Sequence, residues 1–440
     1  MRRRLLVTGL IMGQVLGSAV LAQEPALPLV ALTNVTVIDG RGNAAAPGMT
    51  VLIEGERIRS VLPAGEGAVP ANARQIDLTG HYVIPGLVES HFHSTGLVAR
   101  RGRAALEPEL RRHLYAGVTM VRDMAGDWRL QASVEREIHL KHMVGPDIYY
   151  AAVLGGPRPG SSGRPARFPP PEMWPNRPGP GELVARETDL RATVTRMVGR
   201  GATALKLYLN LEAETVRALV DEARRNGLQV WAHGTVFPDR PVELVRAGVN
   251  GLSHVCWLAY QADGLDPSTN VPFVHTTFPP PFDPEAVNAD GPEFLTLFGE
   301  MAERGVVLDA TYSLYTEGRQ SFWGCTPELV TALMRAAHRA GVPIATGTDT
   351  FADPDEPWPA VFREIELLVD HGILSPMEAI VAATYNGALA AGIADRYGSI
   401  DPGKAASLVV LREDPTEDVR ALRSVVSVFK RGVEYPRSDF

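Results

Sequence analysis

The fold is decided by nine residues, PGLVESHFH, at positions 85–93. A Pro-Gly pair ends the preceding segment, an apolar run begins a strand, and His91 and His93 follow it. Residues two apart on a strand project to the same face, so both imidazoles are predicted to enter one site and share one metal ion. Taken alone, a His-x-His pair is equally compatible with two ordinary polar side chains.

Apolar, strand-like runs alternate with helical patterns over residues 86–395. Eight strand–helix units over this length favour a distorted (β/α)8 TIM barrel. The alternative, an open doubly wound sheet, is disfavoured because no glycine-rich phosphate turn follows the first strand. The predicted strands end at Val88, Met124, Leu154, Leu209, His233, Val255, Thr311 and Thr350.

The two ends of the mature chain share a different pattern. Residues 29–84 read as short alternating strands bounded by turn residues, and residues 407–411 and 425–430 repeat that style. We expect both ends to pair into one small composite β-sandwich. The predicted organisation of this α/β chain is a β-sandwich part at 23–85, the barrel at 86–395 and a second sandwich part at 396–440.

Residues 1–22 combine three arginines, an apolar run and small residues up to Ala22. This pattern predicts a signal peptide and a secreted or periplasmic enzyme that does not associate with the membrane after cleavage. The alternative is an uncleaved membrane anchor, which the glycines within the run disfavour. In an oxidising compartment Cys256 and Cys325 either form a disulfide or stay buried thiols, and the sequence does not decide between them.

The charge composition indicates which class of partner to expect. The chain has 43 basic and 51 acidic residues, a net charge of −8, and a 45% hydrophobic share that suits a globular protein. After residue 4 the only basic stretch is a set of dispersed arginines between residues 100 and 112, so nucleic acid is not expected as a partner and a small molecule is expected instead. The sequence leaves open whether the chain forms a homo-oligomer.

Further metal-type side chains fall where other predicted strands close. His233, His254 and Asp349 each stand at or beside a strand end, and Lys206 lies near the end of another strand. The carboxyl ends of barrel strands meet at one rim, so these side chains are predicted to converge there. Neutral imidazoles with a carboxylate suit zinc, and a lysine aimed into a barrel is costly unless it is paired or chemically changed.

Substrate contacts are predicted around that rim. Tyr208 should face the same way as Lys206 and bind a carbonyl or carboxylate of the substrate. Arg122 closes the second strand and is a candidate substrate contact, with a structural ion pair as the equal alternative. Residues 155–181 and 259–290 form long loops predicted to cover the mouth, which makes His275 a further candidate; a surface insertion without function is the alternative.

The motifs together resemble the metal-dependent amidohydrolase superfamily, in its imidazolonepropionase-like and prolidase-like (Xaa-Pro dipeptidase-like) branch. The resemblance covers nearly the whole mature chain. It is carried by PGLVESHFH at 85–93, AGVTMVRD at 116–123, the Lys206 strand, His233-Gly234, Ser253-His254, GTD at 347–349 and GSIDPGKA at 398–405.

The resemblance implies a centre of two divalent metal ions, zinc being the expected metal. His91, His93 and Asp349 would bind the first ion, His233 and His254 the second, and a carboxylated Lys206 would bridge both. Such a pair of ions would acidify a bridging water to hydroxide for attack on the scissile carbonyl. Asp349 would then accept a proton and pass it to the leaving nitrogen.

One departure from the prolidase-like branch bears on specificity. That branch carries a histidine in a glycine-rich turn after the third strand, whereas this chain reads LGGPRPG at 154–160. Arg158 would substitute there by binding a carboxylate. We therefore predict a hydrolase for amide bonds of dipeptides, N-acyl amino acids or cyclic amides. The alternatives are a lactonase or esterase on the same metals, and a non-catalytic binding barrel, which the intact ligand set disfavours.

Overall fold

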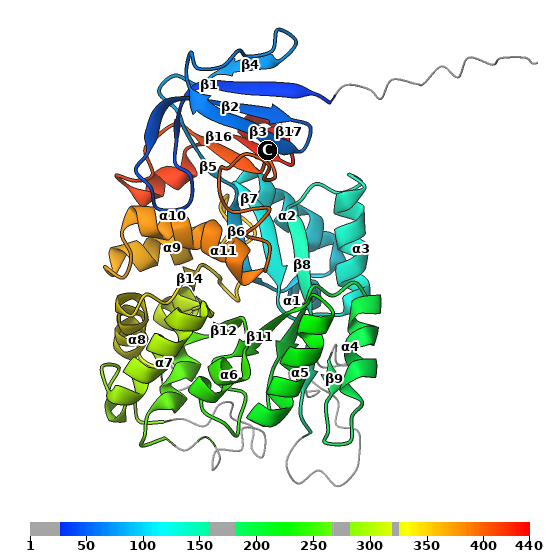
Figure 1. Cartoon of the computed structure of the whole chain (residues 1–440), viewed down its shortest axis with the longest axis vertical. Helices are drawn as coiled ribbons and strands as arrows, with labels where there is room; N and C mark the ends of the chain where they lie inside the picture. Colours follow the sequence, from blue (N-terminus) through cyan, green and yellow to red (C-terminus); the bar gives the residue numbers. More distant parts are fainter. Residues whose placement is uncertain (1–26, 158–180, 266, 268–281, 319–324) are drawn as a thin grey trace, which may run out of the picture.

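The computed structural model describes residues 27–157, 181–265, 267, 282–318 and 325–440 (Figure 1). The predicted signal at residues 1–22 and two predicted substrate contacts, Arg158 and His275, lie outside the described residues.

A parallel barrel forms the centre of the chain and confirms the predicted fold class (Figure 1). Neighbouring strands pair in the order β14-β13-β12-β11-β10-β8-β7-β6, with the short β9 (Glu182–Leu183) added to β8. The barrel strands are β6 (Leu87–Phe92), β7 (Val118–Asp123), β8 (Asp147–Gly155), β10 (Ala204–Leu207), β11 (Gln229–His233), β12 (Gly251–Ser253), β13 (Val307–Asp309) and β14 (Ile344–Ala345).

Helices surround these strands, because each presents an apolar stripe to them. In α5, for example, Val216, Leu219, Val220 and Ala223 are all buried. The helices are α1 (Ser94–Arg101), α2 (Leu106–Tyr115), α3 (Trp128–His139), α4 (Leu190–Gly199), α5 (Ala213–Arg225), α6 (Pro241–Ala247), α7 (Pro292–Arg304), α8 (Pro327–Arg339), α9 (Val361–Asp370), α10 (Pro376–Ala383) and α11 (Tyr385–Ala390).

Shorter helical turns connect these elements; most are 3-10 turns, and one is π-helical. The 3-10 turns are η1 (Arg103–Ala105), η2 (Val255–Gln261), η3 (Pro284–Ala286), η6 (Val419–Arg423) and η7 (Arg437–Asp439), and the π-helical turn is η4 (Leu314–Gly318). Among the described residues, no helix has both the length and the apolarity needed to cross a membrane.

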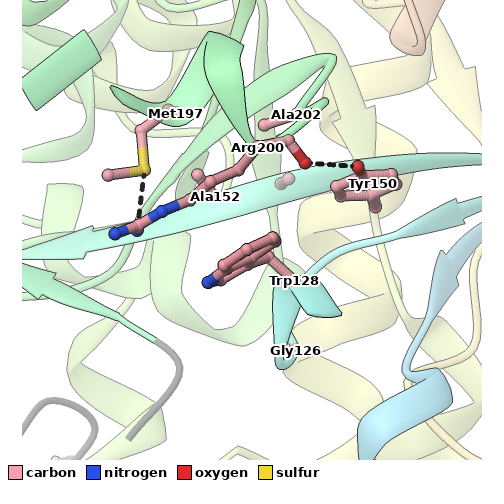
Figure 2. Close-up of a pocket in the computed structure, with 8 residues that line it drawn as sticks. Gly126, Trp128, Tyr150, Ala152, Met197, Arg200 and Ala202 are labelled. Carbon is pink, nitrogen blue, oxygen red and sulfur yellow. Dashed lines mark hydrogen bonds between the residues drawn. The ribbon is translucent and has the colours of Figure 1, made fainter. Parts of the chain in front are cut away.

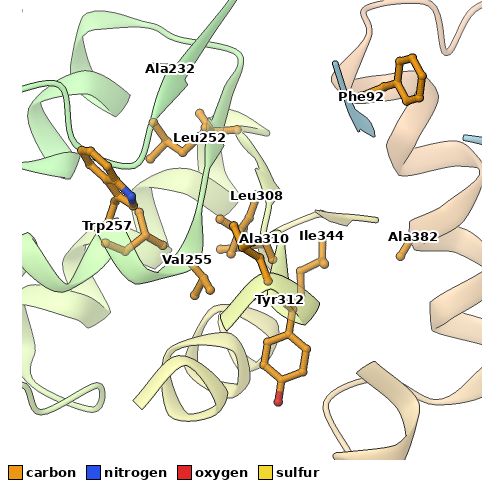
Figure 3. Packing of buried hydrophobic residues seen from close by; sticks show 14 of the residues in the cluster. Phe92, Ala232, Leu252, Val255, Trp257, Leu308, Ala310, Tyr312, Ile344 and Ala382 are labelled. Carbon is orange, nitrogen blue, oxygen red and sulfur yellow. The ribbon is translucent and has the colours of Figure 1, made fainter. Parts of the chain in front are cut away.

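Apolar and polar side chains alternate along the barrel strands, so the residues of the core and those of the candidate site lie on opposite faces. Leu252 and Leu308 are register partners on β12 and β13 and belong to the main apolar core, part of which Figure 3 shows. The next pair in the same register is Ser253 and Asp309. Because successive side chains point to opposite faces, the apolar pair packs against the helices while the polar pair points into the barrel.

The barrel closes between β6 and β14 through a short seam. Ser90 N donates to Thr346 O at 2.9 Å, and Asp349 N donates to His91 O at 3.0 Å. The last strand is shorter than predicted: it ends at Ala345, so Asp349 lies in the following turn and not at the strand end. The physical reason is that Thr348 N leaves the ladder to bond the buried carboxylate of Glu89 at 3.0 Å.

Strands from both ends of the chain form one mixed sheet beside the barrel, which confirms the predicted composite domain. Its order is β17-β16-β15-β5-β1-β2-β3, with β4 paired to β1, and Figure 1 shows the first and last segments side by side. The strands are β1 (Leu29–Val37), β2 (Ala46–Glu54), β3 (Arg57–Pro63), β4 (Arg74–Asp77), β5 (Tyr82–Pro85), β15 (Leu408–Leu411), β16 (Val425–Lys430) and β17 (Val433–Pro436).

The two cysteines are joined, which settles the alternative that the sequence left open. Cys256 in η2 and Cys325 before α8 form a disulfide with their Cα atoms 5.8 Å apart. Cys256 lies two residues after His254, so the bond anchors the turn that follows one predicted metal ligand.

Candidate metal centre

Three of the predicted ligands meet at the seam between β6 and β14. His91 lies in β6, His93 is the residue before α1, and Asp349 follows β14. The Nε2 atom of His93 lies 3.0 Å from Asp349 Oδ1, and Nε2 of His91 lies 4.0 Å from the same oxygen. One ligand atom from each of the three lies within 4.8 Å of the others, which suits a single metal ion.

The other predicted ligands continue this group along the rim. The His254 ring lies 4.7 Å from the His91 ring and 4.6 Å from the His233 ring, measured between centroids. Lys206 is 1% exposed, and its Nζ donates to the Ser253 hydroxyl at 2.9 Å, beside His254. The structure therefore brings all six predicted ligands to the carboxyl ends of the barrel strands.

Hydrogen bonds decide which nitrogen each imidazole offers. Nδ1 of His91 contacts Asp309 Oδ2 at 2.6 Å, Nδ1 of His93 contacts Ala125 O at 3.1 Å, and Nδ1 of His254 contacts Thr311 Oγ1 at 3.0 Å. This leaves Nε2 of His91 and of His254 for a metal ion, whereas Nε2 of His93 faces the other ligand candidate Asp349, whose Oδ1 lies 3.0 Å away. Nδ1 of His233 is buried without a hydrogen-bond partner among the described residues, and a bound cation would satisfy it.

Burial favours the neutral forms that metal binding needs. It lowers the pKa values of His233 and His254 well below the ordinary histidine value, and the pKa of Lys206 to about 7. Neutral imidazoles are the metal-binding form, and a neutral amine is the form that reacts with carbon dioxide. The donor set thus fits divalent metal ions.

Asp349 and His93 differ from the deeper ligands because they are partly open, with side chains 28% and 21% exposed. Burial acts to raise the pKa of Asp349, but nearby His91 and the hydrogen bond from His93 lower it below its usual range. For His93, burial acts to lower the pKa and the contact with Asp349 outweighs it, so the pKa is raised. Asp349 is consequently an ionised carboxylate that substrate can approach.

The backbone at the centre adopts conformations that side chains rarely take. His254, Thr311 and Asp349 have φ values of 73°, 49° and 53°. Such conformations cost free energy and persist only where surrounding bonds hold them. Here the bond from His254 N to Asp309 O at 2.9 Å and the bond from Asp349 N to His91 O hold them.

Sequence reasoning missed two buried carboxylates that support this centre. Glu89 accepts hydrogen bonds from His91 N at 2.9 Å and from Thr348 N, and so ties the two ligand-bearing segments together. Asp309 closes β13 and holds His91. The signal for Asp309 was available, because a carboxylate ending the apolar run 306–308 matches the pattern used to select Asp349.

The structure places two of the predicted substrate contacts, Tyr208 and Arg122, in different surroundings. Tyr208 lies beside the centre, with its ring 4.2 Å from that of His233, and burial raises its pKa so that the phenol stays protonated. Arg122 is 1% exposed, stacks on Trp231 at 4.2 Å and forms an ion pair with Asp309 at 3.3 Å. This geometry favours the structural alternative for Arg122, because the buried guanidinium is paired with Asp309.

The structure also contains a small cavity away from this centre. It lies between α3, β8 and α4, where Arg200 covers the Trp128 ring at 5.4 Å and Tyr150 Oη donates to Arg200 O at 2.6 Å (Figure 2). Its volume of about 10 Å³ holds about one water molecule. None of the candidate ligands lines it.

Comparisons with known proteins agree with this geometry. Ochratoxinase from Aspergillus niger is 25% identical over 406 residues, which cover 80% of this chain and 75% of that protein. A crystal structure of a prolidase-like protein from Bifidobacterium longum is 25% identical with a TM-score of 0.65, covering 93% of this chain and 95% of the other. Phenylurea hydrolase B shares the fold, with 24% identity, a TM-score of 0.70 and coverage of 94% and 98%.

The family comparison covers the whole catalytic barrel. A model of the amidohydrolase family matches residues 82–434, a span that contains every candidate ligand. The chain therefore belongs to the amidohydrolase family and is a metal-dependent hydrolase.

Proposed function

We propose that this enzyme is exported and uses two zinc ions to cleave amide bonds in small amino-acid conjugates, such as dipeptides, N-acyl amino acids or cyclic amides. The observation that carries the proposal is the convergence of His91, His93, Lys206, His233, His254 and Asp349 on one rim. Support for the substrate class comes from the names of two relatives, an ochratoxinase and a prolidase-like protein.

When bound, the divalent ions would polarise the scissile carbonyl and make water acidic enough to attack it. The chain's own residues do the rest. Asp349, ionised and partly open to the mouth, accepts the proton of the attacking water and returns it to the leaving nitrogen. Tyr208 keeps its phenolic hydrogen and donates a hydrogen bond to a carbonyl or carboxylate of the substrate.

An activity screen with metal analysis tests the proposed function. The zinc-reconstituted protein should contain two ions per chain and hydrolyse members of a panel of dipeptides, N-acyl amino acids and cyclic amides. Lactones of matched size form the comparison arm. Hydrolysis of lactones alone would establish the ester-cleaving alternative, and one ion per chain at saturation would contradict the binuclear centre.

Export is the second part of the proposal. Residues 1–22 have the composition of a signal peptide, and the Cys256–Cys325 disulfide suits an oxidising compartment. Protein made in an exporting bacterial host should be recovered from the periplasm with Gln23 as its first residue, measured by intact mass and N-terminal sequencing. Full-length chain in the membrane fraction would instead support the anchor.

A further inference from the structure

One buried carboxylate oxygen lies at the centre of the ligand group. Oδ2 of Asp309 contacts Nδ1 of His91 at 2.6 Å, accepts from the Ser253 hydroxyl at 3.1 Å and from Arg122 at 3.3 Å. Asp309 is 1% exposed, so water does not compete for this oxygen. Side chains from three strands, β6, β7 and β12, therefore converge on a single acceptor.

The contact with His91 fixes the imidazole. An aspartate carboxylate can only accept, so Nδ1 carries the hydrogen and Nε2 keeps the lone pair that a metal ion needs. Gly347 packs directly against this carboxylate. A Cβ atom at position 347 would collide with Asp309 Oδ1 and with the His91 backbone, so there is little space for the carboxylate to move on that side. Asp309 thus sets both the tautomer and the direction of the ring.

The contact with Ser253 links Asp309 to Lys206 and sets the orientation of the Lys206 amine. A hydroxyl has one hydrogen, and the Ser253 hydrogen is donated to Asp309. Ser253 can therefore only accept from Lys206, whose Nζ donates to it at 2.9 Å. This arrangement turns an N–H of the amine toward the serine and leaves the amine lone pair free for reaction elsewhere.

We propose that Asp309 is a positioning residue that aligns two metal ligands at once, His91 directly and Lys206 through Ser253. The Ser253–Asp309 pair then serves a specific purpose, which is to present the Lys206 amine for carboxylation. This inference rests on the proposed binuclear function and deepens it, because it assigns the residues that assemble the centre.

The test compares three variants with wild type. Ser253→Ala removes the hydroxyl that joins Lys206 to Asp309, and it leaves the contacts of Asp309 with His91 and Arg122 in place. Asp309→Asn keeps an acceptor oxygen, whereas Asp309→Ala removes it. Ser427→Ala, a buried serine of the composite sheet that donates to Glu434, is the matched control. Metal affinity is measured by chelator competition, and metal uptake by the apo-protein is followed at increasing bicarbonate concentration.

The expected results differ between the two links. Asp309→Ala should weaken metal binding by roughly 10- to 100-fold, the usual effect of losing a residue that orients a ligand. Asp309→Asn should bind metal more tightly than Asp309→Ala. Ser253→Ala should need several-fold more bicarbonate for half-maximal metal uptake, a shift that a general loss of stability does not produce. Ser427→Ala should behave as wild type in both measurements.

The inference and the proposed function fail in different ways. If wild type loads two ions and Ser253→Ala has the wild-type bicarbonate dependence, the inference is wrong and the proposed function stands. If wild type binds no metal, both are wrong. Asp309→Ala leaves the Arg122 guanidinium buried without its carboxylate, so its folding is checked by circular dichroism, and Ser253→Ala carries the test if that variant does not fold.

Discussion

Asp349→Asn is expected to keep at least part of the bound metal and to lose roughly a hundredfold or more in turnover. An amide oxygen can still face a metal ion, and the other predicted ligands remain, but an amide cannot take up a proton as the carboxylate does. In the native protein the pKa of Asp349 is lowered and its side chain is partly exposed, so the carboxylate is ionised and within reach of solvent.

The loss should fall on kcat more than on KM, because proton transfer occurs on the way to the transition state and not on binding. Steady-state kinetics and metal analysis on the same preparation check this. Asp355→Asn, an exposed carboxylate in the same loop, is the control and should match wild type. A metallated Asp349→Asn enzyme within a few fold of wild type would assign the proton transfer to another residue.

Lys206→Ala is expected to lose most of the bound metal together with the activity. The side chain is buried in β10, and burial lowers its pKa to about 7, so a neutral amine is available for carboxylation close to neutral pH. Removing it would remove the bridge that both ions share. Short-chain carboxylates should partly restore metal content and turnover, because they supply the missing oxygen atoms in the cavity that the lysine leaves.

Metal content per chain, with and without added acetate or propionate, measures this effect. Lys141→Ala, which removes an exposed lysine, is the control for loss of a lysine as such. A fully metallated and active Lys206→Ala enzyme would contradict the carbamate bridge while leaving the histidine assignments in place.

The sequence by itself determined the architecture and the ligand candidates. Hydrophobic alternation and turn residues are local signals, so the strand–helix rhythm and the two sheet-forming ends could be predicted from the chain alone. The position of a polar residue at a strand end also predicts which rim it reaches, because parallel barrel strands all end on one face. For this reason His91, His233 and His254 could be placed together in advance.

Only the tertiary structure decided how those side chains are held. Asp309 acquires its role because β6, β7 and β12 bring His91, Arg122 and Ser253 to it, and no local pattern records such pairings. The same reason applies to Arg122, whose partner is 187 residues away, and to the Cys256–Cys325 disulfide. Asp349 leaves its strand early because the Glu89 carboxylate binds Thr348 N across the seam. Contacts between residues far apart in sequence form only when the barrel closes, and that closure sets the geometry of the site.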